Sequence, residues 1–134
     1  MITYALDTNI VSHIIKGNSV LSERVEQELA NGNRIVIPPV VLYEIRRWLL
    51  FNNSGNRSEM FDALCGHLVL ESMGVESFET AAAEHARLKR AGHNLDDADL
   101  LIAGFCIENE YVLVTNNVKH FELINGIEIV DWMI

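Results

Sequence analysis

Short apolar runs rich in β-branched residues alternate along this chain with longer segments of helical periodicity. Four such runs predict strands, at residues 2–7, 34–39, 111–115 and 126–132, and residues 71–77 predict a further strand or extended segment. Strands that alternate with helices favour a largely parallel sheet whose two faces are covered. We therefore expect an α/β fold in which functional side chains gather beyond the carboxyl ends of the strands.

The segments between these runs predict helices at residues 8–18, 19–30, 40–51, 59–70, 78–92 and 94–105, and a short turn or helix at 116–124. The polar residues 52–58 form the clearest loop. The chain has 134 residues, the length of one ordinary domain, and 49% of them are hydrophobic. This is enough to bury a core without metal or disulfide staples, so residues 1–134 are expected to form a single domain.

The charge balance limits how this chain can bind nucleic acid. Nineteen Asp and Glu against ten Lys and Arg give a formal net charge of −9, which has the wrong sign for general attraction to phosphate. A simple nucleic-acid-binding module is therefore disfavoured. A nuclease stays open, because an acidic pocket loaded with divalent cations presents positive charge to phosphate where the chemistry occurs.

Two features of the sequence concern the cellular compartment. The start of the chain, MITYALDTN, has neither the basic nor the apolar stretch of a signal peptide or membrane anchor. We therefore expect a cytoplasmic protein with no membrane partner. Cys65 and Cys106 stand far apart in apolar company, and both are expected to be reduced core residues.

Two acidic side chains occupy informative places in the first half of the chain. Asp7 ends the first strand, where an isolated Asp is most simply a helix N-cap. Glu44 lies on a predicted helix face with four apolar residues, Val40, Val41, Trp48 and Phe51. A charge on such a stripe indicates either an ion pair, with Arg47 three residues on or with another nearby Arg, or a functional carboxylate.

The segment NLDDADLLIAGF, residues 94–105, places three aspartates at the start of an apolar helix. Capping and the positive end of the helix dipole account for Asp96 and Asp97. They do not account for Asp99, which lies on the same side as apolar residues one and two turns further on. Because this helix is apolar almost all round, we expect the Asp99 carboxylate at the edge of the core.

A last polar group, Thr115, Asn116 and Asn117, follows the apolar run VLV. These residues are ordinary turn formers, but in a parallel sheet they would approach Asp7 and the other carboxylates at one sheet edge. Carboxylates brought together repel one another, so some must be protonated or a cation must neutralise them. Oxygen ligands without a supporting Cys or His cluster favour Mg²⁺ or Mn²⁺. The five histidines, His120 among them, lack zinc-like spacing and are interpreted as surface or structural groups.

Taken in order, these residues resemble the PIN-domain family, and more narrowly the VapC ribonuclease toxins of bacterial toxin–antitoxin pairs. The matching segments are YALDTNIVSHII, VVLYEI and, most specifically, DADLLIAGFCIENEYVLVTNNVKHFELINGIEIVDW. The resemblance implies a PIN-like three-layer sandwich with a largely parallel central sheet flanked by helices. It also implies an endoribonuclease that depends on Mg²⁺ or Mn²⁺ and cleaves tRNA or another translation-related RNA as the toxin of a VapBC-type pair.

Position by position, the resemblance puts the family's acids at Asp7, Glu44 and Asp99, as metal ligands and catalytic residues. Asn117 stands where the family often has a fourth acid. It is counted with the catalytic residues, and its amide leads us to expect one tightly held ion and a second that arrives with substrate. Asp97 lies beside the motif and is expected to assist from outside the ligand set. The residues expected to hydrogen-bond the carboxylates are Thr8, Asn9 and Thr115.

The resemblance also implies a mechanism and partners. The cation would lower the pKa of a water molecule and offset charge on the phosphate, with Asp7 and Asp99 as main ligands and Glu44 as ligand or water-orienting group. The partners would be a second copy in a homodimer and a cognate VapB-type antitoxin whose C-terminal arm covers the acidic pocket. DNA would be contacted only through the antitoxin. The basic residues expected to hold substrate are Arg46, Arg47, Arg87, Lys89, Arg90 and Lys119.

Two other functions remain open from the sequence. A catalytically silent PIN-like protein-interaction domain would retain the fold, and both the missing fourth acid and the net charge of −9 favour it. A phosphatase that begins with an Asp nucleophile after its first strand would need a second Asp two residues on, where this chain has Asn9. Carboxylate-dependent binding of Mg²⁺ or Mn²⁺ separates the nuclease from the silent domain.

Overall fold

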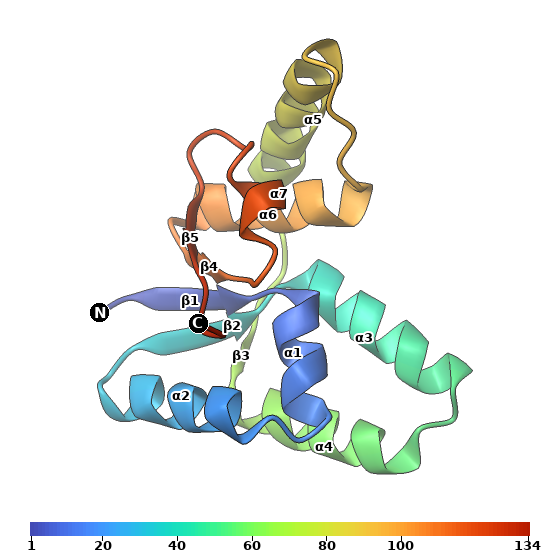
Figure 1. The fold of residues 1–134 in the computed structure, drawn as a ribbon, viewed down its shortest axis with the longest axis vertical. Coiled ribbons are helices and arrows are strands. Elements are labelled where there is room, and N and C mark those ends of the chain that lie inside the picture. Colours follow the sequence, from blue (N-terminus) through green and yellow to red (C-terminus); the bar gives the residue numbers. More distant parts are fainter.

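The computed structural model describes residues 1–134 and shows a five-stranded sheet between two layers of helices (Figure 1). The strands are β1 (Thr3–Leu6), β2 (Arg34–Ile37), β3 (Val69–Leu70), β4 (Val112–Val114) and β5 (Glu128–Val130). All neighbouring strands pair in parallel, in the order β3-β2-β1-β4-β5. The expected α/β sandwich with a parallel central sheet is confirmed.

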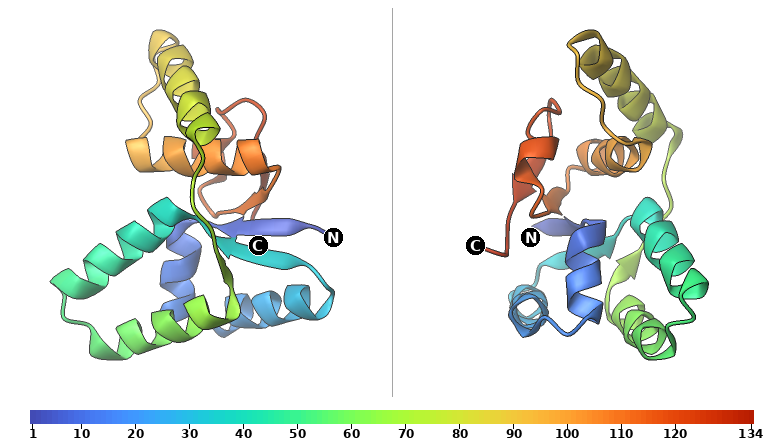
Figure 2. Two further views of the ribbon diagram at one scale, coloured as in Figure 1. Left: turned by 180° about the vertical axis from the view of Figure 1, so that it is seen from behind. Right: turned by 45° about the vertical axis from the view of Figure 1, so that its right-hand side comes forward.

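Seven helices connect and cover the strands. They are α1 (Thr8–Ile15), α2 (Ser19–Ala30), α3 (Pro39–Phe51), α4 (Gly55–His67), α5 (Val75–Arg90), α6 (Asp97–Asn109) and α7 (Val118–Phe121). Helices α1 to α4 lie together on one side of the sheet, and α5 and α6 lie on the other (Figures 1 and 2). None of the seven combines the length and the apolar character that crossing a lipid bilayer requires.

The central strands are almost wholly buried because helices cover both of their faces. In β1 and in β2, three of the four residues are buried, and the buried residues of both layers form one apolar cluster. Helix α6 has more buried residues than any other helix, six of them in the run from Leu100 to Cys106. This explains why α6 is apolar almost all round, as a helix with little access to solvent must be.

The direction in which the chain winds reverses at β1. From β1 the chain moves outward to β2 and β3, and it then returns to place β4 on the opposite side of β1. The backbone N–H of Asp7 donates to the carbonyl of Val114 over 3.0 Å, so the carboxyl ends of β1 and β4 lie side by side. In open α/β sheets, ligands bind in the crevice beyond such a reversal.

One strand lies elsewhere than the sequence predicts. Residues 71–77 form no strand; the strand is Val69–Leu70, which the sequence assigned to the end of the preceding helix. Its two residues pair with Val36 and Ile37 of β2. Because the run LCGHLVL continues a helical pattern, only this long-range pairing distinguishes the strand.

Two details of the helices also differ from expectation. The loop expected at residues 52–58 is shorter, because α4 begins at Gly55. The buried residues of α3 are Val41, Ile45 and Leu49. Trp48 and Phe51, expected on a buried stripe with Glu44, are 38% and 87% exposed. Glu44 therefore lies at the border of the buried face of α3 and does not interrupt it.

Candidate active site

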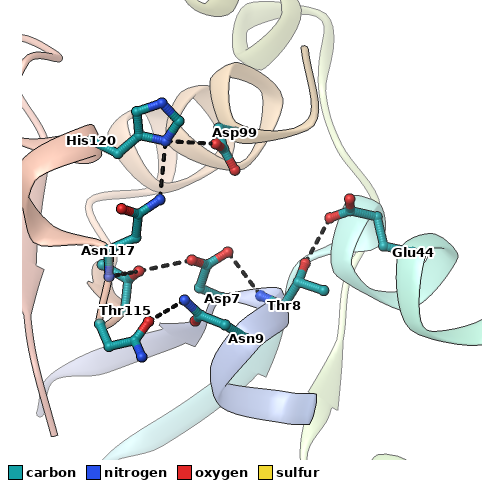
Figure 3. Close-up of polar contacts among 9 residues, drawn as sticks. Asp7, Thr8, Asn9, Glu44, Asp99, Thr115, Asn117 and His120 are labelled. Atoms are coloured by element: carbon teal, nitrogen blue, oxygen red, sulfur yellow. Dashed lines mark hydrogen bonds and ion pairs between the residues drawn. The ribbon is translucent and has the colours of Figure 1, made fainter. Parts of the chain in front are cut away.

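Asp7 lies at the junction of β1 and α1, and only 5% of its surface is exposed. It is the N-cap of α1, and its Oδ1 accepts a hydrogen bond of 2.8 Å from the backbone N–H of Thr8. Its Oδ2 accepts a hydrogen bond of 2.8 Å from the hydroxyl of Thr115, which follows β4. One oxygen of Asp7 thus caps α1. The other is held by Thr115, across the point where the sheet reverses. The carboxylate is fixed at the strand ends (Figure 3).

Asp99 reaches the same place from the first turn of α6. Its side chain is 21% exposed, which confirms the expected position at the edge of the core. Asp96 is the N-cap of α6 but makes no side-chain cap hydrogen bond. The carboxylates of Asp99 and Asp7 face one another across the space between α6 and the end of β1 (Figure 3).

Glu44 approaches from α3. Its Oε1 accepts a hydrogen bond of 2.6 Å from the hydroxyl of Thr8, so Thr8 binds Asp7 through its N–H and Glu44 through its hydroxyl. The Oε2 of Glu44 lies 3.8 Å from the guanidinium of Arg47, whose side chain is 59% exposed. The ion pair considered from sequence is therefore present, but its length and exposure make it weak.

The two aspartates are costly to ionise. Burial, and next the charge of Asp7, raise the pKa of Asp99 to about 6, while His120 acts in the opposite direction. Burial also raises the pKa of Asp7 against the hydrogen bonds from Thr115 and Thr8. No Lys or Arg forms an ion pair with either aspartate. Negative charge is thus gathered here without a matching Lys or Arg, which is the condition that a bound metal ion relieves.

The donor atoms suit a hard cation. Three carboxylates supply oxygen, and Oδ1 of Asn9 is a buried oxygen without a hydrogen-bond partner. No three Asp, Glu, His or Cys side chains already converge on one point, because Glu44 is turned toward Thr8 (Figure 3). The chemistry of these donors fits Mg²⁺ or Mn²⁺, with Asp7 and Asp99 facing a shared space and Glu44 beside it.

His120 is a site residue that the sequence did not reveal. Its Nδ1 lies 3.0 Å from Oδ2 of Asp99 and 3.0 Å from Nδ2 of Asn117. The interpretation of the histidines as surface or structural groups did not anticipate this contact between His120 and Asp99. The available signal was its spacing, because a residue three places after Asn117 shares a helix face with it.

Asn117 does not take the place of a ligand in this arrangement. It is exposed, and its side-chain amide lies against His120 and makes no hydrogen bond to Asp7 or Asp99. Its backbone N–H donates to the hydroxyl of Thr115 over 3.0 Å, so Thr115 joins the turn after β4 to the buried carboxylate.

The remaining polar predictions have mixed outcomes. Asn9 donates to the side chain of Asn116 and makes no hydrogen bond to a carboxylate. Asp97 is exposed and lines a cavity between α5 and α6 with Phe78 and His85. The assisting role expected for Asp97 therefore has no contact to support it.

Two of the basic residues expected to hold substrate are engaged elsewhere. Arg46 forms an ion pair of 2.7 Å with Asp62. Arg87 pairs with Glu84 at 2.8 Å and donates to the carbonyl of Leu123 at 2.8 Å. These two arginines connect elements of the fold, and their contact with substrate stays a prediction.

Comparison with known proteins identifies the family. The sequence profile of the PIN domain matches residues 4–126. Ribonuclease VapC1 of Haemophilus influenzae (strain R2866) is 30% identical over 135 residues, covering 96% of this chain and 97% of that protein. The tRNA(fMet)-specific endonuclease VapC of Shigella flexneri is 29% identical over 137 residues, covering 98% and 99%.

A solved structure shows the same fold. A chain in the crystal structure of VapBC2 from Rickettsia felis, bound to a DNA fragment from their promoter, superposes with a TM-score of 0.90 at 26% identity. The match covers 98% of this chain and 99% of that one. This protein therefore belongs to the PIN-domain family and, within it, to the VapC ribonucleases.

Proposed function

We propose that this protein is an endoribonuclease that hydrolyses RNA phosphodiester bonds with Mg²⁺ or Mn²⁺ held by Asp7, Asp99 and Glu44. The observation that carries the proposal is the buried Asp7 and the half-buried Asp99 facing one space at the reversal of the sheet, with no Lys or Arg paired to either carboxylate. A divalent cation there supplies Lewis-acid chemistry, which acidifies water and offsets negative charge on the phosphate. The relatives named as ribonucleases support RNA as the substrate.

The residues of the chain have separate tasks in this proposal. Thr115 and Thr8 hold the carboxylate of Asp7 from two sides, which fixes a ligand before substrate arrives. Asp99 would supply the second carboxylate, and a divalent cation held there would favour the ionised form of this side chain. Glu44, held by the Thr8 hydroxyl, is placed to bind the cation or to orient water toward the phosphate.

Cleavage of RNA with defined ions and variants tests the proposal. The protein is incubated with total tRNA and with an unstructured oligoribonucleotide in Mg²⁺, in Mn²⁺ and in EDTA. Asp7→Asn and Asp99→Asn are expected to abolish cleavage, whereas Asp97→Asn, a change of the same kind two residues from Asp99, is expected to retain it. Cleavage that persists in EDTA or in Asp99→Asn would contradict the metal assignment.

We propose further that the protein is the toxin of a VapBC-type pair and binds a VapB-type antitoxin. The named VapC relatives and the VapBC complex with the same fold support this pairing. The substrate of such a toxin would be tRNA or another translation-related RNA in the cytoplasm. The protein would act as a homodimer, and it would contact DNA only through the antitoxin. Co-purification with the product of a small adjacent gene, and the mass of the free toxin by light scattering, test these points.

A catalytically silent interaction domain is the second candidate. Two observations favour it: Asn117 replaces a carboxylate, and no three candidate ligands converge on one point. Calorimetric titration with Mn²⁺ separates the candidates, because a nuclease site binds the ion in the unmodified protein and loses it in Asp99→Asn. Absence of carboxylate-dependent binding would favour the silent domain.

A further inference from the structure

Helix α3 presents exposed aromatic and cationic side chains beside the acidic site. The ring of Trp48 is flanked by Lys16 Nζ and by the guanidinium of Arg57, each 5.6 Å from the ring centroid. Beside Trp48 on α3, the guanidinium of Arg47 lies 5.1 Å from the ring centroid of Tyr43. We refer to Lys16, Tyr43, Arg47, Trp48 and Arg57 as the Trp48 face.

The Trp48 face is positive on a chain that is negative overall. It holds three of the ten Lys and Arg residues, although the formal net charge is −9. Lys16 and Arg57 form no ion pair, and Arg47 forms only the 3.8 Å contact with Glu44. Positive charge that carboxylates leave unneutralised is available to phosphate groups.

The Trp48 face is continuous with the proposed active site. A cavity of about 250 Å³ is lined by Lys16 and Trp48 together with Thr8 and Glu44. Thr8 and Glu44 also belong to the network around Asp7. A polynucleotide whose phosphate lies at the carboxylates would therefore pass directly onto the Trp48 face.

We propose that the Trp48 face binds the single-stranded RNA adjoining the scissile phosphate, with an unpaired base stacked on Trp48 and phosphates contacted by Lys16 and Arg57. This proposal rests on the ribonuclease activity proposed above. Aromatic rings between cationic side chains are the recurring platform for single-stranded nucleic acid, because every base has a face that can stack. A cation over an exposed ring is held weakly, so a stacking base displaces it toward a neighbouring phosphate.

Intrinsic fluorescence reports this stacking directly. The chain has two tryptophans; Trp132 is 4% exposed and Trp48 is 38% exposed. A short oligouridylate titrated into the intact protein in EDTA, where the proposed cleavage is switched off, is expected to quench the accessible Trp48 emission. The same RNA annealed into a duplex is expected to quench far less, because its bases are not free to stack.

Binding of a labelled oligouridylate to variants separates stacking from phosphate contact. Trp48→Leu is expected to weaken binding roughly 5- to 100-fold without changing its salt dependence, whereas Trp48→Phe retains most of the affinity. Lys16→Ala and Arg57→Ala are each expected to make the negative slope of log affinity against log salt shallower by about 0.7.

Two controls match these changes. Arg34→Ala removes a cation at the first residue of β2, at the opposite end of the strands from the carboxylates, where it pairs with Glu71. Phe51→Leu removes an aromatic ring that is 87% exposed and has no cation over it. Both variants are expected to bind as the unmodified protein does.

The outcomes distinguish the two proposals. If RNA is cleaved but Trp48→Leu and Lys16→Ala bind it normally, the RNA-binding role of the Trp48 face is overturned and the ribonuclease stands. If oligouridylate quenches Trp48 but no cleavage occurs with Mg²⁺ or Mn²⁺, the ribonuclease proposal fails and the RNA-binding surface stands. If Trp48→Leu alters the oligomeric state in sedimentation and leaves RNA binding unchanged, the face is a protein interface and the inference is wrong.

Discussion

Nδ1 of His120 lies 3.0 Å from Oδ2 of Asp99, a contact that connects the short helix α7 to the first turn of α6. The same nitrogen lies 3.0 Å from Nδ2 of Asn117. Nδ1 cannot hydrogen-bond both groups at once. To donate to the Asp99 carboxylate it must carry a proton, whereas to accept from the Asn117 amide it must offer a lone pair. The charged carboxylate is the stronger partner, so His120 acts chiefly on Asp99.

Replacement of His120 by Ala is expected to raise the pKa of Asp99 further above its ordinary value in the metal-free protein. His120 is the group that lowers this pKa against burial and the charge of Asp7. Carboxyl ¹³C chemical shifts followed against pH in EDTA measure the change. His93→Ala, which removes an exposed histidine outside the site, should leave the titration of Asp99 as it is. An unchanged Asp99 pKa in His120→Ala would show that the 3.0 Å contact has no electrostatic effect.

Asp99→Asn is expected to stabilise the metal-free protein at neutral pH. The pKa of Asp99 rises from 3.8 to about 6 on folding, so the folded state binds this proton more tightly than the unfolded state does. The stability that this bound proton contributes is therefore fully present below the unfolded pKa of 3.8, and it is lost as the pH rises through 6. A shift of this size corresponds to about 3 kcal/mol, which partial exposure of the side chain reduces to an expected gain of about 1–2 kcal/mol in the variant.

Urea unfolding in EDTA at pH 4 and at pH 7.5 checks this expectation. The gain in Asp99→Asn should appear at pH 7.5 and shrink at pH 4, where the carboxyl is protonated in the folded state and about half protonated in the unfolded state. Asp97→Asn is the matched control, since Asp97 is exposed on the same turn and should show no such dependence. Destabilisation of Asp99→Asn at pH 7.5 would mean that the ionised carboxylate has a stabilising partner in the protein.

The sequence predicted those parts of the site that local chemistry can reveal. Asp7 follows a strand and Asp99 interrupts an apolar helix, so each departs from a local pattern that one can see without knowing the fold. His120 departs from no such pattern, because its contact with Asp99 depends on how the turn after β4 directs α7 back over α6. The exposure of Trp48 was missed because the helical period of α3 fits two apolar faces, and only the packing of Ile45 selects one of them.

The fold was also predictable where the sequence carries a local pattern, and not elsewhere. Four strands are long enough in sequence to show as β-branched apolar runs, and their alternation with helices indicated the parallel sheet. β3 has only two residues, Val69 and Leu70, too few for any periodicity. It forms because the chain after α4 reaches the free edge of β2 and pairs with it in parallel. This long-range pairing leaves no pattern in the local sequence.

Thr115→Val is expected to destabilise the protein by about 2 kcal/mol at neutral pH. The variant keeps the shape of a side chain with no exposed surface but removes the hydroxyl that donates to Asp7 and accepts from the N–H of Asn117. Because this hydrogen bond lowers the pKa of Asp7, its loss should also move the Asp7 titration upward.

Chemical denaturation, together with the carboxyl titration, measures both effects of Thr115→Val. Thr80→Val provides the matched control, since the Thr80 hydroxyl also donates to a carboxylate, that of Glu108, but at an exposed site. Its cost should stay within about 0.5 kcal/mol. Equal costs for the two variants would show that burial of Asp7 adds nothing to the value of its hydrogen bond.

Gly104→Ala is expected to destabilise the protein by about 2–3 kcal/mol, because α5 and α6 approach too closely for a side chain at this position. A Cβ on Gly104 would overlap the backbone carbonyl oxygen of Ser77 and lie 3.3 Å from Cβ of Ala81, and backbone atoms cannot move aside as a flexible side chain can. The helices would have to separate along the element that carries Asp99. Gly66→Ala is the control within α4, where a Cβ meets nothing within 4 Å; it should stabilise the helix by up to about 1 kcal/mol. Equilibrium unfolding in urea compares the two, and similar stabilities would mean that α5 does not rest on the backbone of α6 at Gly104.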